Sequence, residues 1–294
     1  LANPHVASVE SRMKIAESDV TVTYTLRSGE PYLEVAVHAL WLQRGGSDIG
    51  TPKLRMLFPT ALEKTSGIYE IPFGTITRDL TKGEEVPSQR FADVSGRTEG
   101  NEIAGVLVLN DSKYGHSLQG STLAVTLIRS SFEPDILPEI GEHDIKMAIL
   151  PHVGSMTRAE MIRQGVAFNR PLKVIGTGVH AGKLPAASPG LTAVEPGNVV
   201  VSGVKKAETG DELVIRLYEA QGTRCTASVE FKDTIFGRVE GARETDLLER
   251  PLKKGTARVK NNGFVVEMPA YGIATVRVRM SGSAARRLRP DSAP

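Results

Sequence analysis

Apolar and polar residues alternate along much of the chain, and this alternation is the clearest structural signal in the sequence. Between residues 20 and 26, valine, tyrosine and leucine occupy every second position, with threonines between them. Residues 33–41 repeat the pattern, and Gly29-Glu30-Pro31 supplies a turn between the two segments. Because successive side chains of a strand point to opposite faces, the pattern predicts strands with one buried and one solvated face. Similar segments predict strands at 53–58, 103–110, 123–128, 143–150, 199–204, 213–219, 226–231, 264–268 and 273–278.

Only one segment has the periodicity of a helix. Thr157-Arg158-Ala159-Glu160 forms a Thr-x-x-Glu capping box, and apolar residues follow at helical spacing up to Val166. A stretch rich in glycine and proline, from Gly176 to Gly197, then predicts a linker or a long loop. Because strands do not alternate with helices, the pattern excludes a doubly wound or barrel-type α/β domain. We expect a large β-sandwich over residues 1–190, a small C-terminal β-sandwich over 191–280 and a disordered tail over 281–294.

Composition matters mainly through what it excludes. The 294 residues carry a formal net charge of +2, from 36 basic and 34 acidic side chains, so no strong field would attract nucleic acid. No apolar run approaches the roughly 20 residues that cross a bilayer, and we therefore expect no membrane partner. The single cysteine, Cys225, rules out an intramolecular disulfide, which favours a reducing, cytoplasmic location, and we interpret it as a small core residue.

The motifs of common catalytic and cofactor sites are absent from the sequence. Gly176-Thr177-Gly178 has its next glycine at Gly182, one residue late for a dinucleotide-binding loop, and no phosphate-binding loop, G-x-S-x-G, H-E-x-x-H or cysteine pair occurs. His143 and Asp144 would point to opposite faces of a strand, so we interpret His143 as packing or hydrogen bonding at a strand start. Four carboxylates could serve glycoside chemistry, but neighbouring prolines and Gly141 favour a solvated loop for them: Glu133, Asp135, Glu139 and Glu142.

Several segments together resemble a known family. They are Tyr-Glu-Ile-Pro-Phe-Gly at 69–74, Glu-Val-Pro-Ser-Gln-Arg-Phe-Ala-Asp at 85–93, Leu-Asn-Asp-Ser-Lys-Tyr-Gly-His at 109–116, Leu-Ile-Arg-Ser at 127–130 with Gly-Glu-His at 141–143, and Val-Ile-Arg-Leu-Tyr-Glu-Ala at 214–220. In order and spacing they are similar to the C-terminal β region of the α-mannosidases of glycoside hydrolase family 38, of the cytosolic and bacterial type. The resemblance covers most of residues 1–280 and implies an all-β fold: a large β-sandwich, of the galactose-mutarotase-like supersandwich kind, followed by a small one.

The resemblance also implies what the chain lacks. In that family a His-x-Asp pair, a nucleophilic Asp and a further His bind zinc in an N-terminal α/β domain, whereas this sequence contains no His-x-Asp. We therefore expect no catalytic residue, no metal ligand and no cofactor here, and assign the zinc of the full-length enzyme to the N-terminal catalytic domain, the expected partner. The chain also begins without an initiator Met and reads as a fragment or a processed piece.

Residues that could contact sugar lie on loops and strand ends. Asp111, Lys113 and Tyr114 fall between two predicted strands, and a charged pair beside an aromatic ring can hydrogen-bond and stack a hexose. The alternative is structural: Asn110-Asp111 forms an Asx-type turn with Tyr114 packed beneath it. Arg129 ends a predicted strand where related enzymes direct an arginine toward substrate, and a surface salt bridge is its alternative.

The sequence thus favours a chain that completes and supports an α-mannosidase acting on terminal α-mannosyl residues of oligosaccharides, and that is inactive alone. Two other functions stay open: a carbohydrate-binding module, and a structural sandwich without a sugar role. A carbohydrate-binding module needs exposed aromatic rings, and aromatic residues make up only 5% of the chain, with Trp41 inside a strand pattern. Linkage preference and assembly into a homo-oligomer are not fixed by the sequence.

Overall fold

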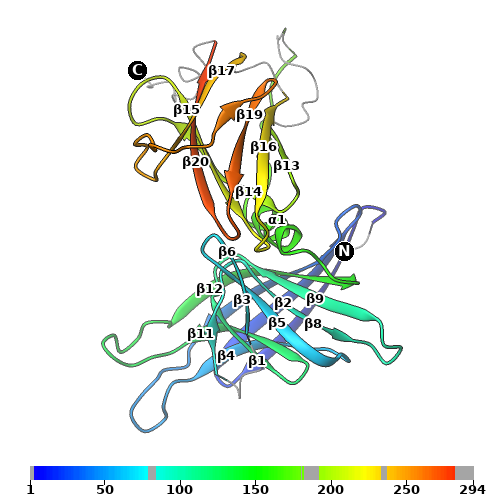
Figure 1. Ribbon diagram of the computed structural model, residues 1–294. Coiled ribbons are helices and arrows are strands. Elements are labelled where there is room, and N and C mark those ends of the chain that lie inside the picture. Colours follow the sequence, from blue (N-terminus) through cyan, green and yellow to red (C-terminus); the bar gives the residue numbers. More distant parts are fainter. Residues whose placement is uncertain (1–2, 79–83, 180, 182–191, 233–236, 282–294) are drawn as a thin grey trace, which may run out of the picture. The chain divides into compact units, whose positions relative to one another are not determined.

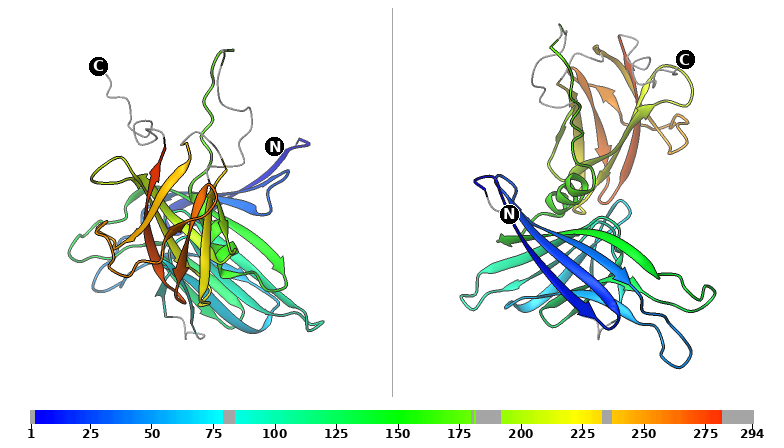
Figure 2. Two further views of the ribbon diagram at one scale, coloured as in Figure 1. Left: turned by 45° about the horizontal axis from the view of Figure 1, so that its top comes forward. Right: turned by 180° about the vertical axis from the view of Figure 1, so that it is seen from behind.

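The computed structural model describes residues 3–78, 84–179, 181, 192–232 and 237–281, and is drawn in Figures 1 and 2. The chain forms two compact units, one from Leu1–Met156 with Glu160–Leu172, the other from Thr157–Ala159 with Lys173–Pro294. Antiparallel sheets build both units, which confirms the all-β fold class. The domain boundary expected near residue 190 and the tail expected beyond residue 281 lie outside the described residues and stay predictions.

The first unit is a sandwich of two antiparallel sheets. Its large sheet has eight strands, in the order β1 (Val6–Ile15), β2 (Ser18–Arg27), β3 (Leu33–Trp41), β12 (Gly141–Val153), β9 (Ile103–Asn110), β8 (Phe91–Arg97), β5 (Glu63–Ile71) and β6 (Gly74–Arg78). Its small sheet has four, in the order β4 (Lys53–Pro59), β11 (Thr122–Arg129), β10 (Gly115–Gln119) and β7 (Val86–Pro87). The chain crosses from one sheet to the other several times, so segments that follow one another in the sequence contribute strands to both sheets.

The core of this unit lies between the two sheets. Alternate residues of β3, ending in Trp41, turn their side chains into it and are almost fully buried, as the alternation predicts. From the small sheet, Leu118, Leu123 and Val125 meet them and are 0% exposed. The hydrophobic pattern read from the sequence therefore marks the inner faces of both layers.

The single described helix, α1 (Arg158–Asn169), packs on the other side of the large sheet. It begins directly after Thr157 and ends before Pro171, as the capping box predicts. A Cβ atom added to Gly165 would lie 3.0 Å from the ring of Phe91, so the helix approaches β8 closely at this glycine. Phe91 alternates along β8 with the core residues Ala92 and Val94, and therefore faces the helix side.

The second unit is a smaller sandwich of two four-stranded sheets. One has the order β13 (Thr192–Glu195), β16 (Cys225–Phe231), β19 (Gly263–Met268), β18 (Arg258–Val259), and the other β14 (Val199–Lys206), β15 (Leu213–Glu219), β20 (Ile273–Met280), β17 (Val239–Thr245). Cys225 packs partly buried against its core, and burial raises the pKa of the thiol, in agreement with its interpretation as a core residue. Among the residues described, no helix is long and apolar enough to span a membrane.

Candidate functional site

The segments between residues 69 and 143 that carried the sequence resemblance converge at one end of the first sandwich, whereas the segment 214–220 forms β15 of the second unit. Asn110 ends β9 and Gly115 begins β10, so the loop 111–114 joins the two sheets at this end. Gly115 pairs with Thr126 of β11, which places the loop 130–140, after β11, on the same side. Phe91 of β8 pairs with Leu109, so the loop 88–90 lies there as well, and the Tyr69–Ala92 pair adds the end of β5. We call the loops 71–73, 88–90, 111–114 and 130–140, together with the strand ends that they join, the motif end.

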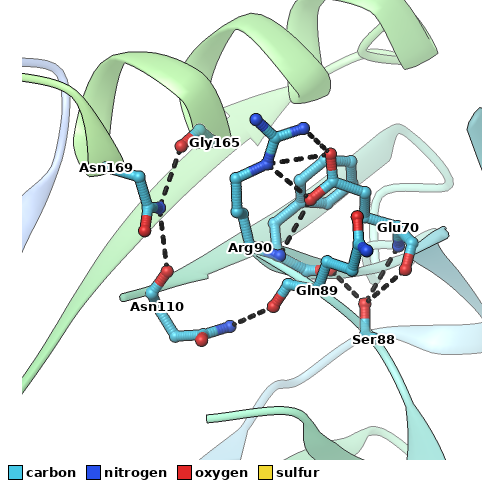
Figure 3. Close-up of polar contacts among 8 residues, drawn as sticks. Glu70, Ser88, Gln89, Arg90, Asn110, Gly165 and Asn169 are labelled. Carbon is cyan, nitrogen blue, oxygen red and sulfur yellow. Dashed lines mark hydrogen bonds and ion pairs between the residues drawn. The ribbon is translucent and has the colours of Figure 1, made fainter. Parts of the chain in front are cut away.

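A buried ion pair forms the centre of the motif end (Figure 3). The carboxylate of Glu70, 1% exposed at the end of β5, accepts the backbone N–H of Arg90 at 2.8 Å. The Arg90 guanidinium donates its Nε–H to both carboxylate oxygens, at 3.1 and 3.0 Å, and its Nη2 also bonds Glu70 Oε1. Because a buried charge is tolerated only with such complete pairing, this contact fixes the loop 88–90 on the end of β5.

Ser88 connects the same loop to two further segments. Its hydroxyl accepts the Glu70 N–H at 2.9 Å and donates to the carbonyl of Phe91. Its own N–H donates to the carbonyl of Tyr114 at 2.9 Å. Ser88 is 2% exposed, so these bonds are shielded from water and hold the 88–90 and 111–114 loops in a fixed relation.

Asn110 connects several segments of the motif end through both its backbone and its side chain. Its N–H donates to Arg90 O at 2.9 Å, and its side-chain Nδ2 donates to Gln89 O at 2.9 Å. Its Oδ1 accepts the N–H of Lys113 at 2.8 Å, and its carbonyl accepts Nδ2 of Asn169, the last residue of α1, at 3.0 Å. Figure 3 shows the bonds of Asn110 to Gln89 and Asn169 beside the Glu70–Arg90 pair. One residue thus joins β9, two loops and the helix.

The loop 111–114 contains three of the four residues predicted to contact sugar. The Lys113 N–H donates to Asn110 Oδ1, so the Asn110 side chain does bond the loop backbone, although three residues on and not the two of the expected Asx-type turn. The proposed packing of Tyr114 beneath that turn is wrong, because Tyr114 is 57% exposed and reaches outward. Tyr114 instead lines a cavity of about 410 Å³ with Glu70, Pro72, Ser88 and others. Asp111 is exposed and accepts the Ser112 hydroxyl at 2.9 Å.

Arg129, the fourth predicted residue, ends β11 and is exposed. Its backbone pairs with Lys53, and no described residue forms an ion pair with its side chain, so the surface salt bridge considered as its alternative is absent from the described part of the chain. The next residue, Ser130, is buried and accepts the indole N–H of Trp41 at 2.7 Å. This bond anchors the strand end from which Arg129 projects. Contact of Arg129, Asp111, Lys113 or Tyr114 with sugar stays a prediction.

The acidic loop 130–140, which follows Arg129 in the sequence, has the solvated character expected from its prolines. Glu133 and Asp135 are exposed, as is Glu142 at the start of β12. His143 bonds the carbonyl of Glu139 at 2.8 Å through Nε2, which confirms the interpretation of His143 as hydrogen bonding at a strand start. Asp144, on the opposite face, bonds His38 at 2.9 Å instead, and this bond raises the pKa of the exposed His38. No group of three or more potential metal ligands occurs among the described residues.

The network of Glu70, Ser88, Arg90 and Asn110 was not foreseen from the sequence. All four lie in the segments quoted for the resemblance, yet their partners are about twenty residues away along the chain. The one available signal is Glu70 itself, because it interrupts the apolar segment Tyr69-Glu70-Ile71 where a strand end becomes buried.

The fold and this site define the class of protein: a two-unit β-sandwich chain with an ordered polar loop end and no catalytic constellation among its described residues. Comparison with known proteins specifies the family. The profile of the glycosyl hydrolases family 38 C-terminal domain matches residues 2–137, and that of the family 38 C-terminal beta sandwich domain matches 198–276. The chain belongs to glycosyl hydrolase family 38 and represents its C-terminal region.

Curated relatives agree with these matches. The chain is 32% identical over 233 residues to alpha-mannosidase 2C1 of Homo sapiens. The aligned region covers 76% of this chain and 21% of the human protein. It is 30% identical to an alpha-mannosidase of Saccharomyces cerevisiae over 258 residues, with 76% and 22% covered. The chain therefore spans only about a fifth of the length of these relatives.

Solved structures show the same fold. An alpha-mannosidase from Enterococcus faecalis V583 superposes with a TM-score of 0.69 over 89% of this chain and 29% of that one, at 18% identity. A second structure, of a family 38 protein from Enterococcus faecalis, gives a TM-score of 0.68 at 19% identity. At such identities the likeness concerns the fold alone.

Proposed function

We propose that this chain is the C-terminal part of a cytoplasmic α-mannosidase that hydrolyses terminal α-mannosyl residues of oligosaccharides together with an N-terminal catalytic domain. The observation that carries the proposal is the motif end. Segments scattered over residues 69–143 meet there, and a buried network fixes the loops 88–90 and 111–114, the second of which presents Tyr114. The bond from Trp41 to Ser130 anchors the strand end that presents Arg129. A binding surface needs this kind of support, because a side chain that must be ordered on binding loses affinity.

The role of the chain in this proposal is to bind and position, not to perform the bond cleavage. An exposed guanidinium can donate charge-assisted hydrogen bonds to sugar hydroxyls, and an exposed tyrosine ring can stack on a hexose. The cavity of about 410 Å³ beside Tyr114 offers room for part of a saccharide ring. The two carboxylates that glycoside hydrolysis requires have no fixed, paired arrangement among the described residues of the motif end.

Zinc does not fit the described residues of this chain. No three potential ligands gather among them, and the sequence has no His-x-Asp pair. We therefore assign the zinc of the full-length enzyme to the N-terminal domain.

The buried position of the only tryptophan disfavours a free-standing carbohydrate-binding module. Trp41 is 2% exposed and its indole N–H bonds Ser130, so it contributes to the core and offers no surface for a sugar. Sugar-binding modules rely on exposed aromatic platforms, which favours the supporting role.

The proposal can be tested by activity and by the upstream coding sequence. The chain alone should not hydrolyse a chromogenic α-mannoside, with or without added zinc, because it lacks the ligand set. The coding sequence upstream of Leu1 should encode an α/β domain with a His-x-Asp pair, and the joined protein should be active. Turnover by the chain alone that a chelator abolishes and zinc restores would contradict the proposal, as would an inactive joined protein.

A further inference from the structure

Among the buried polar atoms of the described residues that lack a hydrogen-bond partner, four belong to three side chains of the first unit. They are the hydroxyl of Tyr69, Nη1 of Arg78 and both ring nitrogens of His116. Tyr69 and His116 are 0% exposed. More than nine in ten buried polar groups of a folded protein are paired, so several orphans in one core need a physical explanation.

The three side chains meet between the two sheets. A Cβ atom on Gly67 would lie 2.8 Å from the Tyr69 hydroxyl, so the Tyr69 ring lies across Gly67 in β5. Gly67 pairs with Arg78 of β6, and the guanidinium carbon of Arg78 stands 4.9 Å from the centre of the Tyr69 ring. The hydroxyl and the guanidinium therefore occupy the same corner of the large sheet.

His116 faces this corner from the small sheet. Its neighbours in the register, Val86 and Val125, both belong to the core, so the His116 side chain also points inward. Burial lowers the pKa of His116 to about 4 and the positive charge of Arg78 acts in the same direction, although a contact with the Tyr114 backbone and the charge of Glu85 oppose them in part. At neutral pH the ring is therefore uncharged and carries one N–H donor and one acceptor.

The charges around this corner do not balance among the described residues. Arg78 stays protonated at every accessible pH. Glu85 is the carboxylate whose charge reaches His116, but it is already bonded to Lys53. A permanent cation with an enclosed, unpaired N–H group thus stands beside two further donors, the Tyr69 hydroxyl and the imidazole N–H.

We propose that Tyr69, Arg78 and His116 bind a small monovalent anion such as chloride between the two sheets of the first unit. A water molecule would accept hydrogen bonds from these donors but would leave the guanidinium charge uncompensated in a poorly solvated place. An anion satisfies both the donors and the charge. It also joins β6, the edge strand of the large sheet, to β10 of the small sheet.

Crystals of the 294-residue chain soaked in bromide provide the direct test. Anomalous scattering should place a bromide within hydrogen-bond reach of Arg78 Nη1, the Tyr69 hydroxyl and one ring nitrogen of His116. Water in that position, a protein carboxylate there, or no density would each overturn the proposal.

A stability measurement tests the same site in solution. The Tm of the first unit, followed by Trp41 fluorescence, should be higher in sodium chloride than in sodium gluconate of equal ionic strength. The gain should be on the order of 5 °C when chloride exceeds its Kd roughly a hundredfold. Arg78→Gln keeps a hydrogen-bond donor but removes the charge and should abolish the difference, whereas Arg12→Gln, on the exposed edge strand β1, should retain it. An equal chloride response in Arg78→Gln and the unaltered chain would refute the site.

Discussion

The carboxylate of Glu219 should be the most sensitive single position of the second unit. Glu219 ends β15 and is 0% exposed. Its oxygens accept five N–H groups, at 2.7 Å from Asn198 Nδ2, 2.7 Å from Gln221, 2.7 Å from Gly222, 3.1 Å from Thr223 and 2.9 Å from Tyr271. The carboxylate therefore ties the loop after β15 to the turn before β20.

The change we consider is Glu219→Gln, which keeps the shape and replaces one acceptor oxygen by a donor NH₂ group. If that group takes the Oε1 position, Asn198 can rotate its amide to accept from it, but the backbone N–H of Gln221 is left facing a donor. A buried donor without a partner costs about 1–3 kcal/mol, and the three remaining bonds lose the extra strength of a charged acceptor, together about 2 kcal/mol. We expect a loss of about 3–5 kcal/mol in the free energy of unfolding of the second unit.

Native-state hydrogen exchange of this chain, read by mass spectrometry, measures that loss unit by unit. Amides of β15 and β20 should exchange faster by about two to four orders of magnitude, since 1.4 kcal/mol is a factor of ten. Amides of the first unit should change little. Glu240→Gln is the matched control, because the exposed Glu240 meets Arg279 at 3.8 Å and such pairs contribute about 0–1 kcal/mol. Protection in β15 within tenfold of the unaltered chain would refute the reasoning.

The pH dependence of the same group gives an independent check. Burial alone would raise the pKa of Glu219, but the donated hydrogen bonds outweigh burial and lower it below its ordinary value of 4.5. A carboxyl whose pKa is lowered on folding stabilises the fold above its unfolded pKa, and this contribution is lost as the pH falls through the folded pKa. The second unit should therefore lose stability below about pH 4.5, and Glu219→Gln should flatten this part of the profile.

Three further predictions concern the first unit and the chain between the units. Arg129→Ala in the joined enzyme should lower kcat/KM by about 10- to 150-fold, the equivalent of roughly 1.5–3 kcal/mol, with an unchanged Tm; unchanged kinetics would remove Arg129 from the site. Limited proteolysis should cut first between Gly176 and Gly197 and in the tail after residue 281; early cuts confined to residues 20–130 would contradict the domain division. The hydrogen bond from Asp93 raises the pKa of His152 above 6.5, so its stabilising effect is present below pH 6.5 and lost as the pH rises through the raised value. Urea unfolding followed by Trp41 fluorescence should show this loss between acidic and alkaline pH, and a His152→Gln variant with the same profile as the unaltered chain would rule it out.

Much of the fold could be predicted because many strands bury apolar residues on one face only. The segments 33–41, 103–110 and 213–219 match β3, β9 and β15 at both ends, and the capping box marks the start of α1. β1 (Val6–Ile15) gave no such signal, since most of its residues are exposed, Val9 at 68% and Met13 at 42% among them, and none is fully buried. An edge strand that buries little surface carries little hydrophobic pattern.

Two strands were missed for the opposite reason, because they bury polar groups. Asp93 in β8 is 0% exposed and bonds His152, 59 residues later in the chain. In β10, His116 and Ser117 occupy consecutive buried positions. Alternation cannot identify a strand when polar side chains are buried through partners distant in the sequence.

The residues of the candidate site also fall into exposed ones, which the sequence indicates, and buried polar ones, which it does not. The exposed residues Asp111, Tyr114 and Arg129 could be named from the sequence, because exposed charged and aromatic residues on loops have recognisable chemistry. The ion pair of Glu70 with Arg90 could not, since its function is to hold the loops and it depends on a contact across twenty residues. Sequence patterns therefore identify what a surface presents more readily than what supports it.

The bonding of Asn110 has a consequence for protein engineering. Its side-chain oxygen and nitrogen have distinct partners, Lys113 N–H and Gln89 O, so aspartate, which cannot donate to Gln89 O when ionised, is no substitute despite its equal size. Slow deamidation at this position would loosen the loop in the same way during storage. A mutant library intended to alter sugar preference should therefore keep residue 110 constant and place its diversity at Asp111, Lys113 and Tyr114, where side chains can vary without breaking the framework beneath them.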